Sequence, residues 1–219
     1  METHFHSQLD GMRVKVLEMA AHAQQAIEDA CRALLERDAD LAQQVIDYDV
    51  IIDRLECEID DISLRLLALD QPLAVDLRSI VGVMRVAANL ERVGDQAVNI
   101  AEQAMFLASR PPLPFADLLR TLSNTALNMF RASIAAFREG DPALAREVCR
   151  TDCYCNEQDV RVMRELINYM SSETPAVERA VSTILTSRSL ERVGDLSTNI
   201  GEAVVFIVEG VSIKHGICS

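Results

Sequence analysis

One pattern of residues occurs twice in this chain, one hundred positions apart. Residues 89–102 read NLERVGDQAVNIAE, and residues 189–202 read SLERVGDLSTNIGE. Farther upstream, residues 36–49 match residues 139–152, now with an offset of 103. Co-linear matches of this kind indicate an internal duplication. The fold must therefore contain two copies of one structural unit.

Each copy divides into three helices at its helix-breaking residues. The predicted helices cover about residues 5–37, 39–69 and 74–108 in the first copy, and about residues 115–139, 142–170 and 175–209 in the second. Gly140 and Gly210 are expected to end helices, and Thr174 before Pro175 is expected to cap one.

The loops between these helices are short, which favours antiparallel neighbours. Helices of about 30 residues extend roughly 45 Å, so the bundles should be elongated. The Pro-rich segment 111–114 separates the copies. The sequence predicts an all-α fold of six helices in two similar antiparallel three-helix bundles, residues 1–110 and residues 111–219.

Charge and hydropathy argue against several classes of protein. The formal net charge is −13, from 34 acidic and 21 basic residues. Nucleic acids are held by clustered Lys and Arg, so they are not the expected partner. The negative charge suits cations or basic protein surfaces, or it only keeps the protein soluble. The N-terminal residues lack the apolar core of a signal peptide, and no uncharged stretch approaches the roughly 20 residues of a membrane helix. We expect a soluble, cytoplasmic protein.

Six cysteines are present: Cys31, Cys57, Cys149, Cys153, Cys155 and Cys218. No CxxC motif occurs, so neither a zinc ribbon nor a thioredoxin-type site is expected. In a reducing compartment these residues should be free thiols. Cys149 and Cys153 share a helix face and Cys155 is close by, so we expect them to be small buried hydrophobic side chains, with a thiolate metal site as the alternative.

Polar residues of the repeated motif form a row on one helix face. At 100° per residue, the row spans an arc of about 80°, nearly opposite the apolar stripe of Val83, Val86, Leu90, Val93 and Ile100. The row consists of Glu91, Asp95, Asn99 and Glu102 in the first copy and Glu191, Asp195, Asn199 and Glu202 in the second. The preceding helix supplies a second row: Asp49, Asp53 and Glu56 in the first copy, and Asp152, Asn156 and Asp159 in the second.

Antiparallel neighbours could bring the two rows of each copy into one patch. Clustered carboxylates repel one another unless they stay apart in water, bind protons or bind cations. Oxygen donors without His or Cys favour hard cations such as Mg, Mn, Ca or iron. The alternative is a solvated face with Arg92 and Arg192 as counter-charges. Gly inside a helix costs about 1 kcal/mol relative to Ala, so the presence of Gly94 and Gly194 in both copies indicates close packing of another backbone at these positions.

No constellation typical of an enzyme is present in the sequence. GxxxxGK[ST], GxGxxG and GxSxG motifs are absent. The four histidines, His4, His6, His22 and His215, form no HExxH motif. We therefore expect a protein that is not an enzyme. The alternative is a metalloprotein that uses the carboxylate rows for metal buffering or metal-dependent catalysis.

The sequence resembles the PhoU family over essentially the whole chain. The resemblance is carried by the paired LERVGDxxxN motifs, the PxxxDLR stretch from Pro72 to Arg78 and the ending VEGVSIKHG at residues 208–216. It implies six helices in two three-helix bundles. It also implies a negative regulator of the phosphate-starvation response that modulates high-affinity phosphate uptake.

As a PhoU-like protein, the chain is expected to act as a cytoplasmic signalling adaptor in phosphate homeostasis. Its implied partners are a sensor histidine kinase and the ATPase of a phosphate ABC transporter, and it would reach the membrane only through them. An accessory protein of a low-affinity phosphate permease is the alternative. The sequence leaves the oligomeric state open, with a homodimer among the options.

The resemblance further implies multinuclear metal clusters of iron or zinc, with other divalent cations as alternatives. The implied metal-binding residues are Glu91, Asp95, Asn99, Glu102, Glu191, Asp195, Asn199, Glu202, Asp49, Asp53, Asp152 and Asn156. Asn156 stands where many relatives have Asp, and Cys153 and Cys155 replace polar or aliphatic residues. We therefore predict that the second site binds a different metal or binds metal less tightly.

Overall fold

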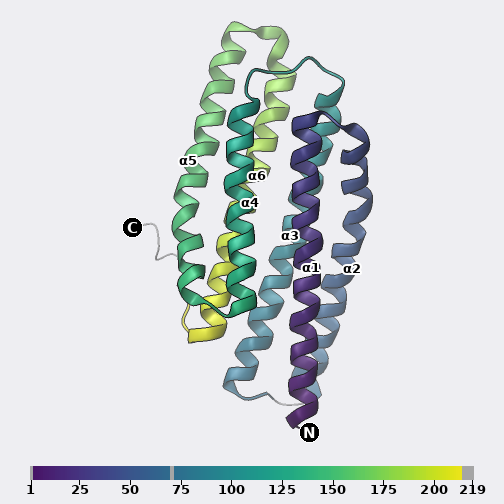
Figure 1. Ribbon diagram of the computed structural model, residues 1–219, viewed down its shortest axis with the longest axis vertical. Coiled ribbons are helices and arrows are strands. Elements are labelled where there is room, and N and C mark those ends of the chain that lie inside the picture. The colour runs from purple at the N-terminus through teal and green to yellow at the C-terminus, as the bar shows by residue number, and fades with distance from the viewer. Residues whose placement is uncertain (1, 70–71, 214–219) are drawn as a thin grey trace.

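The computed structural model describes residues 2–69 and 72–213. Its helices are α1 (Glu2–Glu36), α2 (Ala39–Leu69), α3 (Ala74–Ala108), α4 (Ala116–Glu139), α5 (Pro142–Ser172) and α6 (Val177–Glu209), with a 3₁₀ turn at Thr174–Ala176. Figure 1 shows two elongated three-helix bundles side by side, α1–α3 and α4–α6. The prediction of an all-α fold with two repeated units is confirmed. His215, Cys218 and the end of the VEGVSIKHG stretch lie outside the described residues.

The helix ends show which local signals were interpreted correctly. Gly140 and Gly210 take left-handed φ values of 64° and 74° and end α4 and α6, as predicted. Asp141 caps α5, since its side chain accepts hydrogen bonds from the backbone N–H groups of Ala143 and Leu144. The prediction that Thr174 caps a helix was wrong. Thr174 lies inside the 3₁₀ turn, whose tighter geometry accepts the fixed φ of the proline that follows it.

Arg37 occupies the position in the first repeat that Gly140 occupies in the second. It has a left-handed φ of 62°, which is unfavourable for a residue with a side chain. Its guanidinium compensates by donating to the carbonyl oxygens of Leu107 and Ala108 at 2.7 and 3.0 Å, and also to that of Arg110. These carbonyls end α3, where a cation also favours the helix dipole. These hydrogen bonds connect the turn between α1 and α2 to the C-terminal end of α3.

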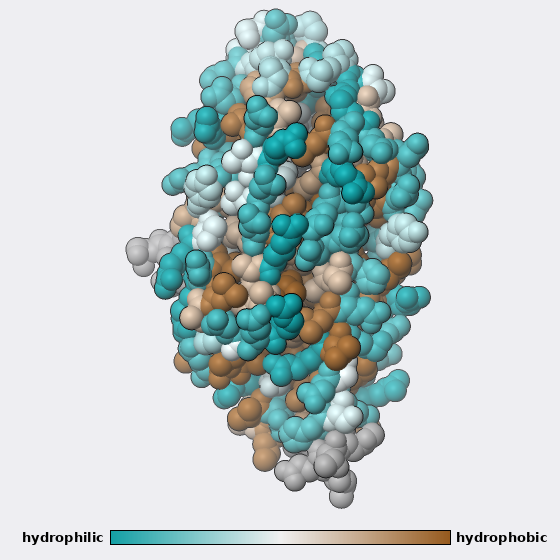
Figure 2. Space-filling view, viewed as in Figure 1, coloured by the Kyte–Doolittle hydropathy of each residue, from teal (hydrophilic) through white to brown (hydrophobic). Residues whose placement is uncertain are grey.

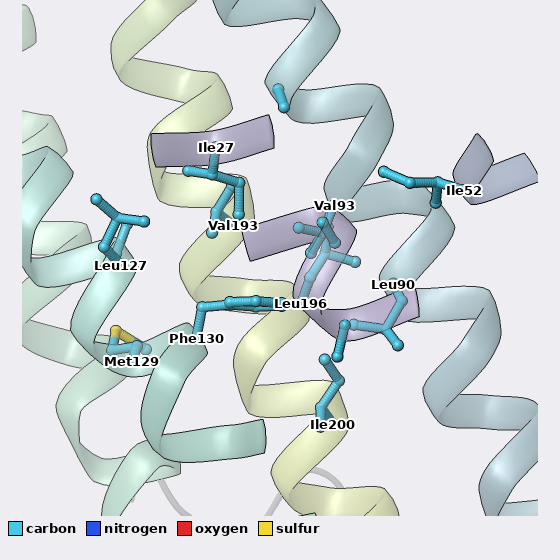
Figure 3. Packing of buried hydrophobic residues seen from close by; sticks show 14 of the residues in the cluster. Ile27, Ile52, Leu90, Val93, Leu127, Met129, Phe130, Val193, Leu196 and Ile200 are labelled. Carbon is cyan, nitrogen blue, oxygen red and sulfur yellow. The ribbon is translucent and has the colours of Figure 1, made fainter. Parts of the chain in front are cut away.

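The two central helices, α3 and α6, run antiparallel and pack against each other. In Figure 1, α1 and α4 lie in front of them. α2 packs on α3 and α5 packs on α6 at the two sides. Figure 3 shows apolar side chains from both bundles converging, among them Ile27 of α1, Val93 of α3, Phe130 of α4 and Leu196 of α6. One continuous core therefore joins the repeats.

The predicted apolar stripe of α3 is fully buried in this core, which includes Val83, Leu90 and Ile100. Glu91 and Asp95, on another face of α3, consequently lie near the acidic residues of α2. Figure 2 shows that the face over α1 and α4 is mainly hydrophilic, with smaller apolar patches. Among the described residues, no helix combines the length and apolar character that crossing a membrane requires.

Candidate functional site

The first repeat carries a group of carboxylates between α2 and α3. We call it the first acidic cluster, and it consists of Asp49, Asp53 and Glu56 of α2 with Glu91 and Asp95 of α3. Burial, together with the charges of Asp53 and Asp95, raises the pKa of Asp49 to about 6. Burial likewise raises the pKa of Glu91, helped by the nearby Asp95 and Glu56. The two predicted rows therefore lie close enough to repel one another.

Gly94 sets how closely α2 and α3 approach at this cluster. A Cβ atom on Gly94 would lie 2.8 Å from Oδ1 of Asp49 and 3.0 Å from Cδ1 of Ile52. The missing side chain thus lets the Asp49 carboxylate lie directly against the backbone of α3. The predicted close packing at this glycine is confirmed.

The second repeat has an equivalent group between α5 and α6. The second acidic cluster consists of Asp152, Asn156 and Asp159 of α5 with Glu191 and Asp195 of α6. Burial raises the pKa of Asp152, and the charge of Asp195 adds to it. Nδ2 of Asn156 donates to Oδ2 of Asp152 at 3.3 Å. Among the described residues, Oδ1 of Asp152 and Oδ1 of Asn156 are buried without a hydrogen-bond donor.

Asp159 distinguishes the second cluster from the first. It is only 1% exposed, and it accepts hydrogen bonds from Oγ of Ser187 at 2.7 Å and from Nη1 of Arg188 at 2.8 Å. The first repeat has Ala87 and Ala88 at the positions of Ser187 and Arg188. No first-cluster carboxylate forms an ion pair within residues 2–69 and 72–213.

The ion pair of Arg188 with Asp159 was not predicted from the sequence. The available signal was the difference between Ala88 and Arg188 at equivalent positions of a duplicated helix. A guanidinium next to the acidic row of only one copy indicates that the copies balance their negative charge differently.

The distal residues of the predicted rows lie mainly along the junction of α3 and α6. Asn99 lines a hollow between α3 and α6 together with Gln96 and Gln103. Asn199 and Glu202 line a separate pocket between the same two helices. Glu102 is exposed. The structure thus brings the Glu and Asp of each LERVGD motif to the preceding helix, and it places the two Asn residues at the junction of the repeats.

Two cysteines pack beside the second cluster. Sγ of Cys155 would lie 3.0 Å from a Cβ atom on Gly194, so this glycine also marks a close approach, as predicted. Burial raises the pKa of Cys155 to about 12 and that of Cys149 to about 11. These thiols stay protonated near neutral pH and fill space, as expected for buried cysteines. Cys153 is exposed, contrary to that expectation; of the other described cysteines, Cys31 is buried and Cys57 is exposed.

The donor chemistry of the clusters suits a hard cation, but the ligand geometry is not assembled. Oxygen donors converge in each cluster, and the raised pKa values of Asp49, Glu56 and Glu91 show negative charge without full compensation. Within the described part of the chain, no group of three or more His, Cys, Asp or Glu side chains is positioned to hold a metal ion.

Fold and site together define a class of all-α proteins built from two tandem three-helix repeats, each with an acidic cluster between its second and third helices. The PhoU domain model matches residues 16–104 and 119–204. The chain belongs to the PhoU family.

Relatives at 30% identity or above match nearly the whole chain. The phosphate-specific transport system accessory protein PhoU homolog of Pseudomonas putida is 35% identical over 212 residues, which is 96% of this chain and 83% of that protein. The phosphate-specific transport system accessory protein PhoU of Escherichia coli is 30% identical over 211 residues, which is 96% of this chain and 88% of that protein. These are accessory proteins, so the expectation that the chain is not an enzyme is confirmed.

Solved structures agree with the fold. The crystal structure of PhoU from Pseudomonas aeruginosa superimposes with a TM-score of 0.92 at 34% identity, covering 94% of this chain and all of that one. The phosphate transport system regulatory protein PhoU from Streptococcus pneumoniae gives a TM-score of 0.90 at 23% identity, covering 96% of this chain and 99% of that one. The second similarity supports the fold alone.

Proposed function

We propose that this protein is a cytoplasmic negative regulator of the phosphate-starvation response that also modulates high-affinity phosphate uptake. The observation that carries the proposal is the similarity of the whole chain to phosphate-specific transport system accessory proteins. In this role the protein is an adaptor between the ATPase of a phosphate ABC transporter and a sensor histidine kinase.

The acidic clusters are the surfaces that we assign to this role. Each cluster contains exposed or half-buried carboxylates with raised pKa values, such as Glu91 and Glu191. Basic patches on partner proteins would relieve the repulsion among these carboxylates on binding. This relief favours association and selects partners by charge. The proposed boundary between the two repeats is the Pro-rich segment 111–114. One cluster lies before this segment and one after it, so each repeat presents one cluster.

The test is a phosphate-starvation reporter in cells that carry this gene, grown in ample phosphate. Deletion of the gene should switch the reporter on, and the wild-type gene should silence it again. The double variant Asp95→Ala/Asp195→Ala should restore silence only partly, because it removes one carboxylate from each cluster. A reporter that stays silent after deletion would contradict the regulatory role.

We also propose that the first acidic cluster binds divalent cations. The ligands would come from Asp49, Asp53, Glu56, Glu91 and Asp95 after these side chains have moved closer together, and the bound cations would supply the positive charge that this cluster lacks. Iron or zinc are the ions implied by the family resemblance, while the oxygen donors also suit Mg or Mn. The second cluster should bind metal less tightly, because Arg188 already neutralises Asp159 there.

This metal proposal is tested on purified protein by metal analysis and by unfolding with and without chelator. At ten times the dissociation constant, a cation should stabilise the protein by about 1.4 kcal/mol. Asp95→Asn should abolish most of this gain, and Asp195→Asn, its counterpart in the other repeat, should retain it. Equal occupancy of both repeats by one ion would contradict the proposed difference between the clusters.

A further inference from the structure

A pocket of about 190 Å³ lies between α3 and α6, at the junction of the two repeats. From α3 it is lined by Arg85, Asn89 and Arg92, whose spacing of four and three residues places them on one helix face. From α6 it is lined by Glu202 and Phe206, among others. The pocket is separate from both acidic clusters.

The two arginines of this pocket, Arg85 and Arg92, have different partners from the arginines elsewhere on α3 and α6. The guanidinium carbon of Arg85 lies 4.4 Å from the centroid of the Phe206 ring. Stacking on an aromatic face holds the guanidinium plane and leaves its N–H edge available to an acceptor. Within residues 2–69 and 72–213, neither Arg85 nor Arg92 forms an ion pair. Two unpaired guanidiniums thus line one pocket of a protein whose net charge is −13.

The duplication supplies an internal comparison for this pocket. The equivalent hollow at the other end of the α3–α6 junction contains Arg188 and Arg192, with Leu185 at the position of Arg85. There, Arg188 pairs with Asp159 at 2.8 Å and Arg192 pairs with Asp195 at 3.2 Å. The positive charges of the second hollow are therefore already paired with carboxylates, whereas Arg85 and Arg92 form no ion pair with any residue that the structure describes.

We infer that the pocket between α3 and α6 binds hydrogen phosphate, with Arg85 and Arg92 as the charged donors. Guanidiniums match the geometry of phosphate oxygens and form the stronger, charge-assisted class of hydrogen bond. A water occupies about 30 Å³ in the liquid, so the pocket has room for a small oxyanion with a few waters. Larger organic ligands occupy sites of roughly 300 Å³ or more.

Glu202 gives the pocket a basis for selectivity. Its carboxylate lines the same wall as Phe206, and it can accept a hydrogen bond from the P–OH group of hydrogen phosphate. Sulfate has the same shape but carries no proton at neutral pH, so it faces the carboxylate as a like charge. The inference goes beyond the proposed adaptor role and does not rest on it.

The experiment is calorimetric titration of the full-length protein with inorganic phosphate at constant ionic strength, near neutral pH. Wild-type protein should bind phosphate, and sulfate should bind at least about tenfold more weakly. Arg92→Gln and Arg85→Gln should each weaken phosphate binding by about tenfold or more. Arg192→Gln alters the same position of the repeated motif in the other hollow. It should leave the affinity for phosphate within about twofold of the wild-type value.

Four results would overturn the inference. These are the absence of phosphate binding in the millimolar range, an equal loss of binding in Arg192→Gln, equal affinity for sulfate, and loss of binding when chelator removes metal. The last would show that phosphate binds through a cluster cation instead. Circular dichroism checks that the variants fold, as expected for the exposed side chains of Arg85 and Arg92. The starvation reporter is read independently, so either proposal can fail alone.

Discussion

In the first acidic cluster, five carboxylates face one another across α2 and α3. In the second, four carboxylates share the equivalent space with an amide, a guanidinium and a hydroxyl. Asn156 replaces the carboxylate of Asp53, while Arg188 and Ser187 both bond to the buried Asp159. The second cluster thus contains a positively charged side chain, that of Arg188. The first cluster depends on water, protons or a bound cation to offset the repulsion among its carboxylates. The duplicated motif was retained while its electrostatic partners diverged.

This comparison shows that a repeated motif does not by itself define a repeated site. Glu91 and Glu191 stand at the same motif position, and burial raises the pKa of both. However, Arg188 counteracts the effect at Glu191, and nothing equivalent does so at Glu91. What differs is one residue on the preceding turn of the helix, where the first repeat has Ala88.

The largest expected effect follows from removing the positive charge of Arg188 in the second cluster. Arg188→Leu leaves the carboxylate of Asp159 buried without its charged partner, and we expect the free energy of unfolding to fall by about 3 kcal/mol. Urea denaturation at neutral pH measures the change. The matched control is Arg92→Leu, which removes an exposed arginine that forms no ion pair with the described residues, and it should alter stability by no more than about 0.5 kcal/mol.

A double variant shows whether this loss comes from the buried charge. Arg188→Leu combined with Asp159→Asn should recover part of the stability, because no uncompensated carboxylate then remains in the core. A double variant as unstable as the sum of its single variants would mean that the two side chains stabilise the fold independently.

The second prediction compares how closely α5 packs against α6 with how closely α2 packs against α3. A Cβ atom on Gly201 would lie 2.9 Å from the backbone oxygen of Ala145, so Gly201→Ala must shift α5 and should cost about 2 kcal/mol. The first repeat has Ala101 at this position, fully buried. Ala101→Gly should cost about 1 kcal/mol through helix propensity. Thermal or urea unfolding measures both changes.

Gly11→Ala serves as the control for helix propensity, since no atom lies within 4 Å of the added Cβ position. It should leave stability unchanged or raise it by up to about 1 kcal/mol. If Gly201→Ala behaves like Gly11→Ala, the contact between α5 and α6 is not as close as the structure indicates.

The fold could be predicted from the sequence because its signals are local and occur twice. The apolar stripe that contains Val83 and Leu90 follows the helical period, and Gly140 and Gly210 mark helix ends by their own conformational preference. The duplication then provided a second, independent indication of each helix. Only the 3₁₀ turn at Thr174 was misinterpreted, since a proline in a first turn fits both types of helix.

The candidate site was predictable only in part. Periodicity placed Glu91, Asp95 and Asn99 on one face, but an arc of about 80° is wide enough to meet two different neighbours. Glu91 and Asp95 face α2, whereas Asn99 lies at the junction with α6. Helix rotation relative to neighbouring helices depends on tertiary packing, which a single-helix pattern does not encode. The pairing of Asp159 with Arg188 depends on the same tertiary packing, and the only sequence signal for it was the difference between Ala88 and Arg188.

The smallest expected effect concerns the charge of the first cluster itself. Because burial and neighbouring carboxylates raise the pKa of Asp49 from its usual 3.8 to about 6, the folded protein binds this proton more tightly than the unfolded chain. The stability contributed by that proton is fully present below about pH 4 and is lost as the pH rises through about 6. Above that pH, ionised Asp49 weakens the fold.

Asp49→Asn should therefore stabilise the metal-free protein near pH 8 by about 1 kcal/mol, after allowance for solvent screening of this half-exposed side chain. The gain should shrink as the pH falls from about 6 to about 4, because the wild-type carboxyl is then protonated as well. Urea denaturation in the presence of chelator measures both curves. Asp152→Asn should gain less, since Asn156 donates a hydrogen bond to the Asp152 carboxylate. Equal gains in the two repeats would mean that the clusters carry equal electrostatic strain, and the contrast between them would then rest on Asp159 and Arg188 alone.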